Sequence, residues 1–188
     1  MPVGPFSGQR TFSNTRQNCG PESSRAPAMI PLFLLLASPA SPPSCQANQL
    51  SLAFDSEGGA FDGMSQSGAL LVIRNIGPSA CTVPGLPTLT LEDAKGRALS
   101  IGRKVPPGMH PGPVTLPVGI APDAEVTAKL HWVSAAVYDH SRCLATRFAA
   151  ISIAGQSIQA KFAAHICGPS SANVTVDQPV LRADPRLD

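Results

Sequence analysis

Residues 126–132 read Val-Thr-Ala-Lys-Leu-His-Trp, and apolar and polar side chains alternate along the whole stretch. A period of two places successive side chains on opposite faces of a β-strand. The pattern therefore predicts an amphipathic strand, and its buried face carries Val126, Ala128, Leu130 and Trp132.

Similar patterns recur on both sides of this stretch. Alternating apolar residues predict strands over 50–55, 88–92 and 174–176, and a hairpin over 147–162 that turns at Gly155-Gln156. The turn Asp93-Ala94-Lys95-Gly96 predicts a second hairpin into 98–101. Residues 69–75, Ala-Leu-Leu-Val-Ile-Arg-Asn, are apolar on both faces, which is typical of a central strand covered on both sides.

Composition supports the same fold class. The 188 residues include 20 Pro and 16 Gly, and only 14% are charged, so the chain is rich in turn formers and poor in helix formers. We therefore predict an all-β protein, a single immunoglobulin-like antiparallel β-sandwich of about seven strands.

Two loops are long enough to carry recognition. Residues 105–122 contain six prolines and three glycines, which predicts an irregular, extended connection with little ladder pairing. Residues 56–67 form the second loop. Met109 and His110, in the longer loop, are the candidate binding residues.

The N-terminal region differs from the rest. Ile30 to Ala37 is the only strongly apolar run, and it is too short to span a bilayer, which needs roughly 20 residues. It fits the core of a signal peptide, with a cleavage point after Ala40 and a start at either Met1 or Met29. We therefore divide the chain into a polar and signal segment at 1–44, a β-sandwich domain at 45–181 and a flexible tail at 182–188.

This segment predicts a secreted or periplasmic protein without a transmembrane segment after signal removal. A lipid anchor on Cys45 is disfavoured, because the prolines before it make a poor acylation address. Lys and Arg are scattered and the net charge is +2, which argues against nucleic acid as a partner. The domain is long enough to be stable as a monomer.

Cysteines are expected to staple the domain. Cys19 lies in the leading segment, which leaves four for the folded part: Cys45, Cys81, Cys143 and Cys167. An even number in an exported chain indicates two disulfides, although four cysteines allow three connectivities. Sequential pairing, Cys45 with Cys81 and Cys143 with Cys167, is preferred because each pair closes a short loop.

The order of these features resembles a bacterial exported family known as a domain of unknown function, number forty-two thirty-two in its series. The resemblance is carried by Cys45, by residues 71–86 and 87–96, by the strand ending in Trp132, and by the two late cysteines. It implies a secreted protein or lipoprotein with a β-sandwich fold, and it implies no catalytic residues.

Three groups suggest chemistry. Asp139-His140-Ser141 with Cys143 resembles a nucleophilic site, but neighbours this close in a loop point apart, so a solvated turn is favoured. His165 and Cys167 share one face of a strand, and with Met109-His110 they suggest a soft-metal site. A bridged Cys167 cannot ligate, so no metal and no cofactor is predicted.

The leading hypothesis is a non-catalytic binding or interaction module that presents its loops to an unknown protein or small ligand outside the cytoplasm. The alternative is a small exported enzyme or soft-metal-binding protein that uses His140, His165 and Cys167. Free thiols would distinguish the alternative from the leading hypothesis.

Overall fold

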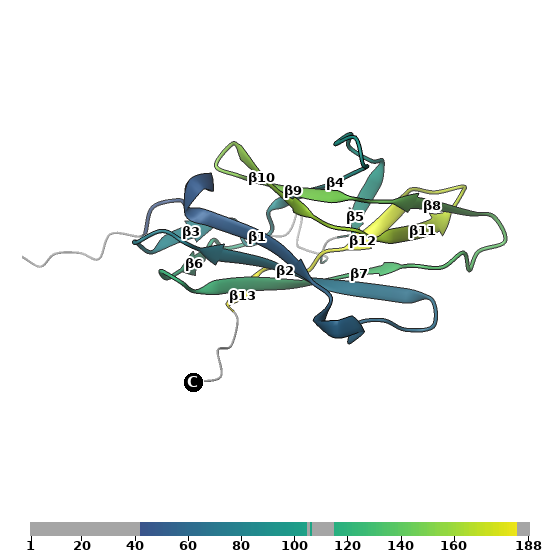
Figure 1. The fold of residues 1–188 in the computed structure, drawn as a ribbon, viewed down its shortest axis with the longest axis horizontal. Helices are drawn as coiled ribbons and strands as arrows, with labels where there is room; N and C mark the ends of the chain where they lie inside the picture. Colours follow the sequence, from purple (N-terminus) through teal and green to yellow (C-terminus); the bar gives the residue numbers. More distant parts are fainter. Residues whose placement is uncertain (1–41, 105, 107–114, 184–188) are drawn as a thin grey trace, which may run out of the picture. The chain divides into compact units, whose positions relative to one another are not determined.

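The ladder between β2 (Gln66–Asn75) and β7 (Glu125–Val133) forms the centre of the fold. The computed structural model in Figure 1 describes residues 42–104, 106 and 115–183. The strands run antiparallel, with Leu71 opposite Ala128 and Ile73 opposite Val126. Their alternation sends these apolar side chains to one face, as the sequence pattern predicts.

Further strands extend this ladder into a six-stranded sheet. The order along the sheet is β1 (Leu50–Asp55), β2, β7, β12 (Val174–Asp177) and β5 (Ile101–Lys104). A short strand, β13 (Arg182–Ala183), also pairs with β7, so these two residues of the predicted tail lie against the sheet.

One pair in this sheet is parallel, which the antiparallel prediction did not include. β5 runs parallel to β12, with Ile101 opposite Val174. The predicted hairpin over 93–101 is reduced to a single bridge between Glu92 and Ala98, after which the chain leaves β4 (Thr88–Glu92). Arg103 holds the crossing strand, because its Nη1 donates to Pro87 O and to Gln178 Oε1, both at 2.9 Å.

A second, three-stranded sheet has the order β10 (Gln156–Lys161), β9 (Phe148–Ile153) and β4. Ala154 and Gly155, both with positive φ, connect β9 to β10. A two-residue turn of this kind matches the twist of a hairpin. The hairpin predicted over 147–162 is therefore confirmed, with its turn at Ala154-Gly155, one residue earlier than predicted.

Two short ladders complete the described strands. β8 (Ser141–Ala145) pairs with β11 (His165–Pro169), and β3 (Cys81–Val83) pairs with β6 (Val118–Ile120). β6 lies within the connection that is predicted to be irregular, so three residues of this connection do join a ladder. The last of them, Ile120, is buried in the core. Single-turn 3₁₀ helices, η1 (Ala47–Gln49) and η2 (Glu57–Gly59), flank β1.

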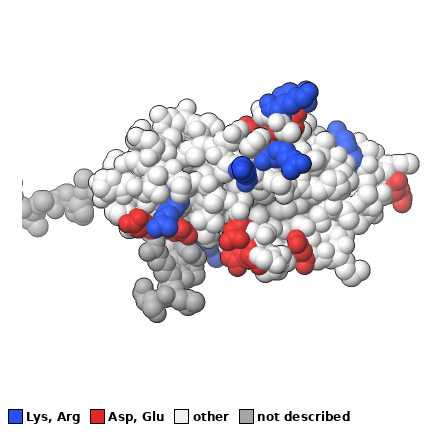
Figure 2. Space-filling model, in the orientation of Figure 1, with Lys and Arg blue, Asp and Glu red and all other residues white. Residues whose placement is uncertain are grey.

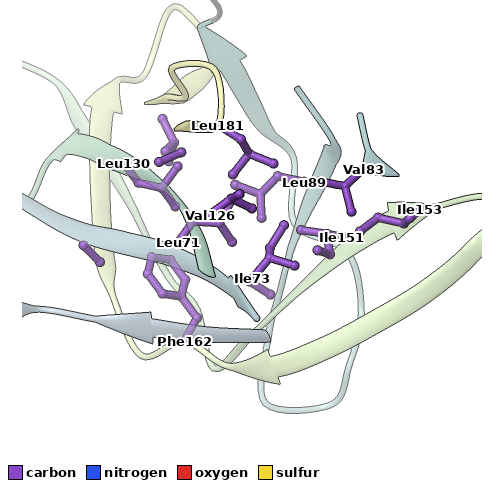
Figure 3. Packing of buried hydrophobic residues seen from close by; sticks show 14 of the residues in the cluster. Leu71, Ile73, Val83, Leu89, Val126, Leu130, Ile151, Ile153, Phe162 and Leu181 are labelled. Carbon is purple, nitrogen blue, oxygen red and sulfur yellow. The ribbon is translucent and has the colours of Figure 1, made fainter. Parts of the chain in front are cut away.

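One hydrophobic core lies between the two sheets. Figure 3 shows Leu71, Ile73 and Ile151 among the packed side chains, which come from both sheets. The predicted buried face of β7 is confirmed from Val126 to Trp132. β2 is central, as predicted, but its second face is only partly covered. Leu70 and Val72, which lie on that face, are partly exposed.

The predicted all-β sandwich with two disulfides is therefore confirmed. The described residues form thirteen strands where the periodicity predicts about seven, and the additional ones are short. On the face drawn in Figure 2, charged side chains stand in small separate groups of both signs.

Candidate functional site

The described part of the chain contains a cleft of about 390 Å³ beside the end of β7. Three parts of the chain form it: the end of β1 with the loop after it and the start of β2, the end of β7, and the end of β10 with the residues that follow it. Its lining residues are Phe54, Ser56, Asp62, Ser67, Gly68, Ala69, Trp132, Ser134 and Lys161 to His165.

Three aromatic rings line the inner part of this cleft. The Phe54 and Phe162 ring centroids lie 4.6 Å apart, and Trp132 meets Phe162 edge to face at 5.5 Å. Trp132 and Phe162 are buried, whereas Phe54 is partly exposed. The period of two along β7 places Trp132 here, because it directs every second side chain toward the interior.

The Trp132 indole has an unusual environment. Trp132 is 7% exposed, and among the described residues its Nε1 is a buried side-chain nitrogen without a hydrogen-bond partner. A buried N–H of this kind costs roughly 1–3 kcal/mol when it is left unpaired. An acceptor that reached this N–H would remove that cost. Trp132 also borders a smaller hollow near Lys104 and Asp177.

The loop that edges the cleft is fixed by its own contacts. Lys129 Nζ lies 4.4 Å from the centroid of the Phe61 ring, and Ser134 N–H donates to Ser65 O at 2.8 Å. A Cβ at Gly68 would come within 2.9 Å of Phe61 Cβ and 2.7 Å of Leu130 O. Glycine at this position therefore lets Phe61 pack against the sheet.

Polar groups surround the aromatic floor. Asp62 and Lys161 supply opposite charges, and His165 Nδ1 lies 3.1 Å from Ser134 O. The cleft therefore combines an apolar interior with hydrogen-bonding and ionic groups at its edge, as small-molecule sites commonly do.

The predicted disulfides are both present with the preferred pairing. Cys45 joins Cys81, and Cys143 joins Cys167. Because Cys167 is bridged, it offers no free thiol to a metal ion in this oxidised form.

Of the residues of the alternative hypothesis, His165 and Cys167 lie together, with 3.7 Å between His165 Nδ1 and Cys167 Sγ, but His140 does not join them. His165 edges the aromatic cleft, but His140 lies at another hollow with Tyr138 and Ser170. Ser141 Oγ is engaged in a turn, since it accepts from Tyr138 N–H and donates to Tyr138 O at 3.1 Å. The favoured interpretation, a turn that precedes a strand, agrees with these contacts, because 139–140 form the turn and Ser141 begins β8.

Met109 and His110 lie outside the described residues, as do the predicted signal segment and Cys19. The loop at 56–67 does contribute Ser56 and Asp62 to the cleft. Phe54, Phe162 and Lys161 also line the cleft, although they were not among the candidate residues predicted from the sequence. Their alternation marks them only as strand residues, and the pairing of the two sheets brings them together.

Within the described residues, no helix is long and apolar enough to cross a membrane. Two disulfides are typical of proteins in oxidising compartments outside the cytoplasm.

Comparisons with known proteins agree with the resemblance seen in the sequence. No curated protein matches the chain. No solved structure matches it either. The family model described as "Domain of unknown function (DUF4232)" matches residues 45–185. This match begins at the first disulfide cysteine and covers all thirteen described strands, and the chain belongs to this family.

Proposed function

We propose that this domain is a non-catalytic binding module, secreted or periplasmic and monomeric, that holds a small organic ligand in the cleft beside Trp132. The ligand carries a flat apolar ring and at least one hydrogen-bond acceptor. The observation that carries the proposal is a cleft in which three aromatic side chains lie beneath a polar edge.

The dimensions favour a small molecule. Ligand pockets usually occupy about 300–1,000 Å³, and this cleft, at about 390 Å³, suits a one- or two-ring compound. Phe54 is partly exposed and sits 4.6 Å from Phe162, so a ligand ring can extend the existing aromatic cluster.

The polar groups define the rest of the ligand. The Trp132 N–H is buried and has no partner in the described residues, so an acceptor on the ligand would pair with it only if the indole shifts to expose this atom to the cleft. Lys161 favours an anionic substituent on the ligand, and Asp62 favours a cationic one.

A binding role also accords with the positions of the reactive groups. Ser141 is held by Tyr138, Cys143 is bridged, and His140 lies at a different hollow from His165. A nucleophile and its base must lie within hydrogen-bond reach of each other. Ser141, Cys143 and His140 are instead engaged in other contacts or lie at other hollows.

The test is a screen of ring-bearing carboxylates, amines and neutral amides by ligand-observed NMR, with affinities measured by calorimetry. Phe54→Ala should weaken binding at least tenfold, because it removes the accessible ring of the floor. Trp132→Phe keeps a ring and removes the donor, so it should weaken binding about five- to tenfold. Lys161→Glu should shift the preference from carboxylates to amines.

Leu116→Ala is the matched control, since Leu116 is an exposed apolar residue away from the cleft. Its affinity should equal that of the wild type. The proposal is wrong if no compound of the panel binds at millimolar concentration, or if Phe54→Ala and Leu116→Ala bind alike.

A further inference from the structure

Three ligand-bearing side chains meet on the short ladder of β8 and β11. Cys143, His165 and Cys167 each offer one ligand atom, and these atoms all lie within 4.8 Å of one another. The geometry points to a masked metal site: reduction of the Cys143–Cys167 disulfide opens a Cys₂His site for Zn²⁺ or a similarly soft divalent ion.

The backbone already holds the two cysteines together. Cys143 and Cys167 are directly opposite in the antiparallel ladder, which continues from Ser141 to Ala145. The hydrogen bonds of the ladder do not depend on the disulfide, so the two sulfurs remain neighbours after reduction. Ile166 anchors β11, because its side chain is fully buried in the core.

The third ligand is placed by the strand period. His165 lies two residues before Cys167, so both side chains leave the same face of β11. His165 Nδ1 lies 3.7 Å from Cys167 Sγ. In a tetrahedral zinc site, bonds of about 2.0 Å to nitrogen and 2.3 Å to sulfur place these ligand atoms roughly 3.5 Å apart.

Two adjustments complete the site. The sulfurs must separate from their bonded distance to about 3.8 Å, which follows once the S–S bond is broken. His165 Nδ1 must also exchange its 3.1 Å contact with Ser134 O for the metal, in the tautomer that carries its proton on Nε2. Two thiolates and one imidazole then leave the fourth position to water.

The two disulfides differ in their access to a reductant. Cys45 and Cys81 are 0% and 2% exposed, and both belong to the buried residues. In the other bridge Cys167 is also buried, at 2% exposure, but Cys143 is partly exposed. A thiolate must reach a sulfur to exchange with a disulfide, so Cys143 is the accessible point of attack.

The chemistry requires a dithiol reductant, as a thiol–disulfide oxidoreductase supplies. Its first thiolate attacks one sulfur and its second thiol closes a disulfide on the reductant, so two electrons and two protons pass to Cys143 and Cys167. Binding of the divalent ion then releases those two protons, because thiolates are the ligands.

The experiment uses the full chain, reduced with a phosphine and titrated with Co²⁺, followed by displacement with Zn²⁺. The reduced wild type should bind one Co²⁺ per chain with a thiolate-to-cobalt charge-transfer band, and the oxidised wild type should bind none. His165→Ala should weaken Co²⁺ binding by tenfold or more. Loss of a group that only hydrogen-bonds to a metal ligand already lowers metal affinity about 10–100-fold. Circular dichroism before and after reduction reports the fold.

Cys143→Ser with Cys167→Ser is the matched control, because it keeps Cys45, Cys81 and Cys19. It should fold and show no charge-transfer band after reduction. The proposal is overturned if the control binds Co²⁺ like the wild type, if His165→Ala binds as tightly as the wild type, or if reduced wild type binds none. Loss of the β-sheet signal on reduction, or failure of the control to fold, also overturns it, since the ladder would then depend on the bridge.

Discussion

The Trp132 indole packs edge to face against the Phe162 ring, with 5.5 Å between the centroids, although Trp132 belongs to the six-stranded sheet and Phe162 adjoins the three-stranded one. Trp132 lies near the end of β7, and Phe162 follows directly after β10. Both residues belong to the hydrophobic core and at the same time line the cleft. This aromatic pair therefore contributes both to the stability of the fold and to the proposed binding site.

Phe162→Ala should lower the free energy of unfolding by about 3–5 kcal/mol, because it leaves a cavity between the sheets. Trp132→Phe should change it by less than about 1 kcal/mol, since removal of an unpaired buried N–H offsets part of the lost contact. Urea unfolding followed by circular dichroism measures both. A loss for Trp132→Phe as large as that for Phe162→Ala would contradict this account.

The sequence predicts local features of this protein well and long-range pairing less well. The alternation along 126–132 identifies β7, and the turn at Gly155 identifies the hairpin of β9 and β10. The parallel alignment of β5 and β12 has no local signal. It depends on hydrogen bonds among Pro87, Arg103 and Gln178, which lie far apart in the sequence.

The cleft also depends on contacts between residues far apart in the sequence. Trp132 was predicted to face the core, which is correct, but its neighbours Phe54 and Phe162 come from separate strands. Only the approach of the two sheets brings these rings together. The cysteine pairing was easier to predict, because short sequential loops left one preferred connectivity.

Asn75→Ala should cost about 2–4 kcal/mol, although it removes only a small polar group. The Asn75 side chain is fully buried, and its Nδ2 donates to Ser79 O at 2.8 Å and to Ile120 O at 3.1 Å. Its Oδ1 accepts from Gly77 N–H at 2.9 Å. Truncation leaves these partners unpaired, and urea unfolding measures the loss.

Asn173→Ala serves as the comparison, because Asn173 is an exposed residue just before β12. Its unfolding free energy should stay within about 0.5 kcal/mol of the wild type, as is usual at the surface. Equal losses for the two variants would show that the buried network adds no stability.

Asp93 should make stability depend on pH in the acid range. The backbone N–H of Arg97, its guanidinium and the N–H of Lys95 lower the pKa of Asp93 from 3.8 to about 2. A carboxylate with a depressed pKa stabilises the folded state above its unfolded pKa, and this contribution is lost as pH falls from about 4 through 2. As pH falls from about 4 to about 2, the melting temperature of the wild type should therefore decrease more than that of Asp93→Asn.

The Arg97→Ala variant checks the cause. It removes the guanidinium, whose Nε and Nη2 lie 2.8 Å and 2.7 Å from Asp93 Oδ2, and keeps the backbone N–H. The pKa of Asp93, followed by carboxyl NMR titration, should rise part of the way toward 3.8. Parallel acid curves for wild type and Asp93→Asn would contradict the assignment.

The two disulfides should open in a fixed order, with Cys143–Cys167 reduced before Cys45–Cys81. Their sequence separations of 36 and 24 residues give similar chain-entropy contributions, each roughly 3–4 kcal/mol. The difference comes from exposure: Cys45 and Cys81 are both buried in the core, whereas Cys143 is partly exposed. Cys143 and Cys167 sit on a continuous ladder.

Graded reduction with a phosphine, trapping with an alkylating agent and peptide mass spectrometry will show the order. Labels should appear on Cys143 and Cys167 at reductant concentrations that leave Cys45 and Cys81 unlabelled. Paired Cys→Ala variants should show the same ranking, with loss of the buried pair costing about 1–2 kcal/mol more in urea unfolding, because its removal also leaves a cavity. Simultaneous labelling of all four cysteines would mean that reduction proceeds through global unfolding, and the ladder would then contribute nothing to the order.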